Sequence, residues 1–223
     1  MITKNDIVIV FDLDDTLCNE IDYLESAYKE ISIYLSHKTN KPAHIIFNEL
    51  ITFYREGLNA FEEIIIKYNL KVVSSNDLLH IYRNHFPNIK LSKSTNNILI
   101  ALKKNAFKVG LITDGRSVQQ RNKIKALQLL DYFDDIIISE EFGSEKPNIK
   151  NYLYFQDKYK QANCVYIADN TQKDFISPNK LGWITICLLD NGKNIHKQDF
   201  NLRTDKKPLY VINHLSEVNA LLK

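Results

Sequence analysis

Helical and strand-like patterns alternate along the second half of the chain, and this alternation constrains the fold more than any other feature. Apolar residues at helical spacing predict helices over residues 95–104, 117–127, 148–160 and 171–181. The apolar runs between them predict strands over residues 107–113, 136–138, 164–168 and 183–188. Helices and strands that alternate at these lengths form right-handed crossovers. The sequence therefore predicts an α/β fold with a doubly wound parallel sheet.

The first half of the chain combines one strand with a helical segment. Val8 to Phe11 is an uninterrupted apolar run, as expected of a strand buried on both faces. Between residues 19 and 86, four groups of apolar residues recur at helical spacing, and no strand pattern interrupts them. We therefore predict a helical cap domain over residues 19–86, inserted into a core domain formed by residues 1–18 and 87–223.

The end of the chain is less regular. The polar stretch 190–208 is longer than most connections between elements, which favours either a functional loop or a poorly ordered one. A last strand over residues 209–212 and a helix from Leu215 are predicted to follow it.

Composition and charge exclude several classes of protein. The 29 basic and 27 acidic residues give a net charge of +2 without a concentrated basic stripe, which argues against nucleic-acid binding. No apolar run approaches the roughly 20 residues that span a bilayer, and the polar segment Met1–Asp6 lacks a secretory signal pattern. The three cysteines have no metal-ligand spacing and favour a reducing compartment. We expect a cytoplasmic monomer or homodimer with no membrane partner.

Polar side chains follow the predicted strands at the point where each strand ends. Doubly wound sheets bind ligands at these carboxyl ends, so the side chains there are candidate site residues. In chain order they are Asp12, Asp14, Thr113, Asp114, Gly115, Lys146, Asp169 and Asp174. Carboxylates bind divalent cations, whereas a hydroxyl, an ammonium and backbone amides beside a glycine bind phosphate oxygens. The sequence therefore predicts a phosphate site with its metal ion.

Four short segments at these positions resemble the motifs of the haloacid dehalogenase-like hydrolase superfamily. FDLDDTL (11–17) resembles the first motif and LITDG (111–115) the second. The lysine of SEKP (144–147) matches the third, and DNTQKD (169–174) matches the fourth. The resemblance covers essentially the whole chain, including a helical cap inserted just after the first motif. It implies the phosphatase branch of this superfamily.

The resemblance implies a catalytic role for four residues. Asp12 resembles the nucleophile that attacks phosphorus and becomes an aspartyl phosphate. Asp14 resembles the general acid that protonates the leaving oxygen and then the base that activates water. Thr113 and Lys146 would bind the transferring phosphoryl group, and Lys146 would also offset the charge of the nucleophile. These roles agree with the chemistry, because phosphoryl transfer depends chiefly on positioning and charge neutralisation.

The resemblance also implies a Mg²⁺ cofactor and a wider binding site. The implied metal ligands are Asp12, Asp14 through its backbone carbonyl, and Asp169. Asp174 is also implied at the metal site, where it would steady the ion either through water or without contacting it. The implied substrate-binding residues are Thr113, Asp114, Gly115 and Lys146. Two positions depart from the family pattern, because Ala168 stands where glycine is usual and Ile176–Pro178 where small residues are common.

The implied activity is a phosphatase for a small phosphorylated metabolite. Segment 111–147 is similar to family members that dephosphorylate nucleotides or acylneuraminate phosphates. Nucleoside monophosphates, sugar phosphates and acylsugar phosphates are therefore the expected substrates, since a cap over the site limits access. The alternatives are a phosphomutase, which shares the four motifs, and a non-catalytic phosphometabolite-binding module. A dehalogenase is disfavoured, because that branch has no metal and needs no counterpart of Asp14 or Asp169.

Several other polar residues are expected to have structural roles. Asp15 is predicted to be a turn residue, because aspartate favours turns. Tyr54, Arg55 and Arg83 are candidate substrate contacts in the cap, although aromatic residues at helical spacing are more typical of a core. The six histidines have no metal-ligand spacing and are expected at the surface or in the core.

Overall fold

A six-stranded sheet lies at the centre of the chain in this computed structural model, which describes residues 7–105 and 108–221. Its strands are β1 (Ile7–Phe11), β2 (Lys108–Thr113), β3 (Asp135–Ile138), β4 (Asn163–Ala168), β5 (Ile184–Leu188) and β6 (Tyr210–Ile212). They pair in the order β3-β2-β1-β4-β5-β6, and every pair is parallel. The predicted α/β fold with a doubly wound parallel sheet is confirmed.

Strand β1 lies in the middle of the sheet because its sequence, IVIVF, is apolar on both faces and buried throughout. Phe11, its last residue, lies opposite Leu111 of β2 and Ile167 of β4. The backbone N–H of Asp12 extends this register by donating to the carbonyl of Ile167 at 2.9 Å. The carboxyl ends of these three strands therefore meet at one edge of the sheet.

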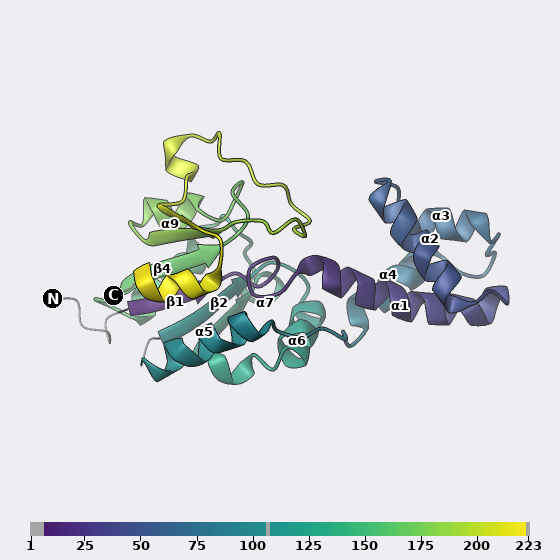
Figure 1. Cartoon of the computed structure of the whole chain (residues 1–223), viewed down its shortest axis with the longest axis horizontal. Helices are drawn as coiled ribbons and strands as arrows, with labels where there is room; N and C mark the ends of the chain where they lie inside the picture. Colours follow the sequence, from purple (N-terminus) through teal and green to yellow (C-terminus); the bar gives the residue numbers. More distant parts are fainter. Residues whose placement is uncertain (1–6, 106–107, 222–223) are drawn as a thin grey trace.

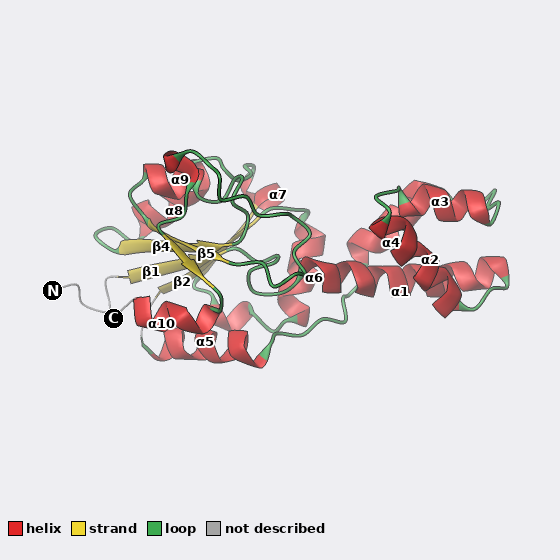
Figure 2. Ribbon diagram, turned by 45° about the horizontal axis from the view of Figure 1, so that its top comes forward, coloured by secondary structure: helices red, strands yellow, loops and turns green. Residues whose placement is uncertain are grey.

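Helices cover both faces of the sheet (Figure 2). On one face lie α5 (Lys93–Lys104), α6 (Ser117–Ala126) and α10 (Val218–Leu221), which pack on the side chains of Ile9 and Phe11. On the other face lie α8 (Lys150–Lys158), which packs on the side chains of Val8 and Val10, and α9 (Ile176–Lys180), which contacts β5. Because successive strand residues point to opposite faces, the IVIVF run supplies both cores.

The helical segment after β1 forms a separate group of four helices (Figure 1). They are α1 (Glu20–Thr39), α2 (Ala43–Arg55), α3 (Ala60–Lys67) and α4 (Ser75–Asn84). Their apolar faces form a buried cluster of their own around Ile31, Leu50 and Leu78. The helix α1 leads away from the carboxyl end of β1, so this group lies at the same end of the sheet as the predicted site residues. No helix within the described ranges is long and apolar enough to cross a bilayer.

Some predicted boundaries were wrong. The predicted helix 171–181 is a series of turns followed by α9, which begins at Ile176. Pro178 has no N–H to donate to the carbonyl of Asp174, and the hydroxyl of Tyr152 donates to that oxygen instead, at 3.3 Å. A short helix, α7 (Ser139–Phe142), was not predicted.

Other elements differ by a few residues at their ends. The helix predicted over 148–160 is the shorter α8, and the predicted last helix begins as a 3₁₀ turn, Leu215–Glu217, before α10. Two predictions fall outside the described residues. They are the start of the second strand at Phe107 and the polar segment Met1–Asp6 without a secretory signal pattern.

Candidate active site

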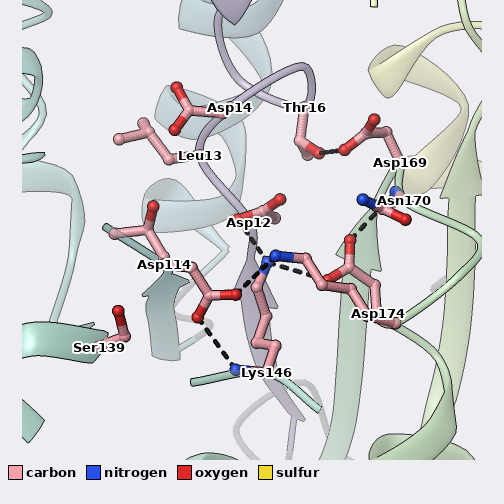
Figure 3. Close-up of polar contacts among 12 residues, drawn as sticks. Asp12, Leu13, Asp14, Thr16, Asp114, Ser139, Lys146, Asp169, Asn170 and Asp174 are labelled. Atoms are coloured by element: carbon pink, nitrogen blue, oxygen red, sulfur yellow. Dashed lines mark hydrogen bonds and ion pairs between the residues drawn. The ribbon is translucent and has the colours of Figure 1, made fainter. Parts of the chain in front are cut away.

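Three buried carboxylates converge at the carboxyl end of the sheet (Figure 3). Asp12 follows β1, Asp169 follows β4, and Asp174 lies in the turns before α9. One oxygen from each lies within 4.8 Å of the others, and the three residues are no more than 6% exposed. The structure thus brings together three of the four predicted metal-binding residues by their side chains.

Lys146 is the cation that contacts this cluster. Its ammonium lies 2.8 Å from Oδ1 of Asp12 and 2.9 Å from Oδ1 of Asp174, and its side chain is 1% exposed. Burial opposes the charge, but contact with Asp12 and Asp174 raises the pKa of Lys146 well above its usual value. The lysine is therefore a fixed positive charge beside the predicted nucleophile.

One lysine does not balance three carboxylates. Burial, with the charge of Asp174, raises the pKa of Asp12 to about 7, although Lys146 opposes this shift. Burial and the charges of Asp12 and Asp174 raise the pKa of Asp169 to about 9. The ionised forms thus need more positive charge than Lys146 supplies. Hard oxygen donors at this spacing fit a divalent cation such as Mg²⁺, which would supply that charge.

Asp14 points away from this cluster (Figure 3). Its Oδ1 lies 2.7 Å from the ammonium of Lys123, and its Oδ2 accepts a hydrogen bond from Nε2 of Gln120 at 3.0 Å. Both partners lie on α6, and both are buried. Sequence reasoning missed Gln120 and Lys123. Two polar residues on the face of α6 that must pack on the sheet were the available signal, because buried polar groups need partners.

The residues after β2 are held by hydrogen bonds to neighbouring loops. The Thr113 hydroxyl accepts from Gln120, and Asp114 accepts from the backbone N–H of Lys146 at 3.0 Å. Gly115 has a φ of 142° and donates its N–H to the hydroxyl of Ser139 at 2.9 Å. The N–H of Gly115 is therefore engaged by Ser139, and the role of Gly115 in substrate binding stays a prediction.

The long loop after β5 reaches back to the site and is a structured part of it. Nδ2 of Asn194 donates to Oδ2 of Asp169 at 2.8 Å, and Gln198 donates to the backbone carbonyl of the same residue at 2.8 Å. The N–H of Ile195 donates to Asp15 at 2.9 Å. Asp15 has a φ of 54° and also accepts from the N–H of Glu20, which agrees with its predicted role in a turn.

These groups enclose a cleft of about 130 Å³. Its lining residues are Asp12, Asp14, Asp15, Glu20, Thr113, Asp114, Lys146, Asp169, Asn170, Lys173 and His196. His196 is exposed, as expected of a surface residue, and it lies at the edge of the cleft. Glu20 begins α1, so the helical group contributes directly to the wall.

The candidate contacts Tyr54, Arg55 and Arg83 differ in whether they line a cavity. Tyr54 and Arg55 line an adjacent cavity of about 460 Å³ together with residues 192–195 of the long loop. Burial and the charge of Glu20 raise the pKa of Tyr54 above its usual value. Arg83 lines neither cavity.

Known proteins share this sequence pattern. The sequence model of the haloacid dehalogenase-like hydrolase family matches residues 9–188. A protein of Methanocaldococcus jannaschii named glyceraldehyde 3-phosphate phosphatase is 29% identical over 231 aligned residues, which cover 96% of each chain. The pyrimidine 5'-nucleotidase YjjG of Escherichia coli is 30% identical over 129 residues, which cover 56% of this chain and 54% of the nucleotidase.

A solved structure has the same fold. The hydrolase YfnB of Bacillus subtilis, whose structure holds magnesium, superimposes with a TM-score of 0.64 at 20% identity. The match covers 97% of this chain and 98% of YfnB. With the family match over residues 9–188 and the four motifs at the ends of the strands, the chain belongs to the haloacid dehalogenase-like hydrolase family.

Proposed function

We propose that the protein is a Mg²⁺-dependent phosphatase that hydrolyses a small phosphorylated metabolite through an aspartyl phosphate. The observation that carries this proposal is the contact between Asp12 and Lys146 beside two further buried carboxylates. It provides a nucleophile, a cation for the phosphoryl oxygens and an oxygen-rich metal site at one point. The relatives named phosphatases support the reaction class of a phosphoric monoester hydrolase.

In the first step, an oxygen of Asp12 attacks phosphorus, and the bond from phosphorus to the leaving oxygen breaks. Asp14 transfers a proton to that oxygen as the bond breaks. Lys146 and Thr113 donate to the phosphoryl oxygens as negative charge develops on them. In the second step, Asp14 takes a proton from water, which attacks phosphorus and releases phosphate from Asp12.

The metal ion would be held by the carboxylates of Asp12 and Asp169, by the backbone carbonyl of Asp14, and by Asp174 directly or through water. When bound, Mg²⁺ would neutralise charge on the phosphoryl group and the nucleophile. The hydrogen bonds of Asn194 and Gln198 would orient Asp169 for this role.

The first candidate substrate is a triose phosphate such as glyceraldehyde 3-phosphate. The relative with that name aligns over 96% of this chain, including the helical group that borders the cleft. Nucleoside monophosphates are the second candidate, because the E. coli nucleotidase aligns over 56% of the chain. Sugar and acylsugar phosphates complete the substrate class.

Phosphate release from a panel of these compounds, with and without Mg²⁺, tests the proposal. We expect release from at least one of them that depends on Mg²⁺. A phosphatase releases inorganic phosphate, whereas a phosphomutase moves the phosphoryl group to another position of the substrate, so analysis of the products separates the two. Binding of a metabolite without any release would identify a non-catalytic module and contradict the proposal.

Asp14→Asn is expected to lower turnover by about 10²–10⁴-fold for an alkyl phosphate, because the leaving oxygen then receives no proton. The loss should be much smaller for formation of the aspartyl phosphate from 4-nitrophenyl phosphate, whose leaving group needs no proton. Burst kinetics with both substrates measure this difference. Equal losses in the first step for both substrates would exclude the acid role.

We also propose that residues 19–86 act as a cap that selects the substrate. Tyr54→Phe and Arg55→Gln should raise KM for the best metabolite, with a smaller effect on 4-nitrophenyl phosphate, because both residues line the cavity next to the cleft. Lys71→Gln, at an exposed position between α3 and α4, is the matched control. If no cap substitution changes the ranking of substrates, specificity lies in the loops of the sheet.

The compartment and the oligomeric state belong to the same proposal. All three cysteines are free thiols, which supports a reducing, cytoplasmic setting. We propose a monomer or a homodimer, and the molar mass in solution would decide between the two.

A further inference from the structure

Lys123 is a buried cation outside the phosphate cleft. Its side chain is 1% exposed, and its ammonium contacts the carboxylate of Asp14 at 2.7 Å. On another side the ammonium lies 4.5 Å from the ring centre of Tyr23. Burying an ammonium is unfavourable unless it is paired, so the two contacts must together hold the charge in this place.

Lys123 and Gln120 together fix the direction of the Asp14 carboxylate. Lys123 holds Oδ1, while Gln120 donates to Oδ2 at 3.0 Å and also donates to the hydroxyl of Thr113. A carboxylate with both oxygens held has little freedom to rotate. Asp14 therefore lines the cleft in one orientation, which α6 determines.

The helical group contacts α6 at the same place. Tyr23 belongs to α1, is fully buried, and donates its hydroxyl to the carbonyl of Tyr82 in α4 at 2.6 Å. Next to Lys123, Asn122 donates to the carbonyl of His85, at the end of α4, at 3.1 Å. The ammonium of Lys123 thus lies between the site and two helices of the cap.

We propose that Lys123 is a positioning residue that sets the direction of the Asp14 carboxylate. Because Lys123 also contacts the ring of Tyr23, this direction depends on the position of that ring. The inference rests on the proposed function, because the direction of Asp14 matters only if it transfers a proton. Proton transfer to a leaving group requires alignment, and small displacements lower the rate strongly. A shift of α1 would move the ring of Tyr23 and, through the side chain of Lys123, change the direction of the Asp14 carboxylate.

Lys123→Met tests this inference, because methionine fills similar space without the charge. The two substrates are 4-nitrophenyl phosphate, which leaves without a proton, and an alkyl phosphate, which needs one. We expect kcat for the alkyl phosphate to fall by about 10–100-fold, and formation of the aspartyl phosphate from 4-nitrophenyl phosphate to fall by roughly threefold or less. Lys125→Met, an exposed change on the same helix, should leave both rates unchanged.

Two variants of Tyr23 test the connection to the cap. Tyr23→Leu removes the ring that faces the ammonium and should shift the ratio of the two rates in the same direction as Lys123→Met. Tyr23→Phe keeps the ring and should keep the wild-type ratio, although it loses the hydrogen bond to Tyr82. This comparison does not depend on Lys123→Met being able to fold.

The outcomes distinguish the inference from the proposed function. If the wild-type protein releases phosphate from neither substrate, the proposed function is wrong. If it hydrolyses both and Lys123→Met lowers the two rates equally or not at all, the positioning role is wrong. Equal ratios for Tyr23→Leu and Tyr23→Phe would overturn the connection to the cap.

Discussion

Asp12→Asn is expected to lower phosphate release by at least about 10⁴-fold while the protein stays folded. The amide keeps the shape of the side chain but cannot attack phosphorus. Loss of the charge should also relieve repulsion, because burial and Asp174 already disfavour the ionised carboxylate and raise the pKa of Asp12 to about 7. Steady-state release of phosphate and thermal melting measure the two effects.

The control for this variant is Asp131→Asn, an exposed change outside the cleft, purified in the same way. It should retain the activity of the wild type, which would show that a loss of phosphate release in Asp12→Asn does not come from the purification. Wild-type turnover by Asp12→Asn would refute the covalent mechanism. A loss of activity together with a lower melting temperature would indicate a structural role for Asp12 instead.

Asp169→Asn is expected to abolish the response to Mg²⁺ and to stabilise the metal-free protein. Asp169 is 3% exposed, and burial together with the charges of Asp12 and Asp174 raises the pKa of its carboxyl to about 9. Removing this charge relieves an unfavourable buried group, but it also removes a carboxylate ligand. Activity and stability should therefore change in opposite directions.

Chelation provides the matching experiment on the unchanged chain. Wild-type protein should lose activity after exhaustive chelation, recover it with Mg²⁺, and melt at a higher temperature when Mg²⁺ is present. Asp169→Asn should melt at the same temperature with and without Mg²⁺. Full activity of the wild type after chelation would contradict the metal-assisted mechanism.

The order of the elements could be predicted from the sequence because period and composition are local properties. The apolar run Val8–Phe11 predicted a strand buried on both faces, and the positions of Asp12, Thr113 and Asp169 at strand ends placed them at one edge of the sheet. The predicted family is confirmed by the match over residues 9–188. The roles of the site residues stay predictions until the variants are measured.

The surroundings of the site depended on contacts between distant segments. Asn194 carries no local pattern, and Lys123 shows only that a polar residue stands on the face of α6 that packs on the sheet. Each meets its carboxylate only after the chain has folded. The loop 190–208 could not be assigned because hydrogen bonds to Asp169 hold it, rather than any periodic packing. The helix α9 begins at Ile176 rather than at residue 171 because Pro178 has no N–H to donate within an earlier turn. Pro178 is visible in the sequence, but the predicted helix 171–181 did not take it into account.

The place of β1 in the sheet also affects how the protein is made. Val8, near the start of β1, pairs with Lys108 on one side and with Cys164 on the other. Translation adds about 5–20 residues per second, so this apolar strand leaves the ribosome several seconds before either neighbour exists. Helices α1–α4 contact one another over shorter stretches of chain, so they can pack together before the partner strands of β1 have been synthesised. A nascent chain that stops before β4 therefore keeps an apolar strand with an open edge, and at this stage synthesis is most exposed to aggregation.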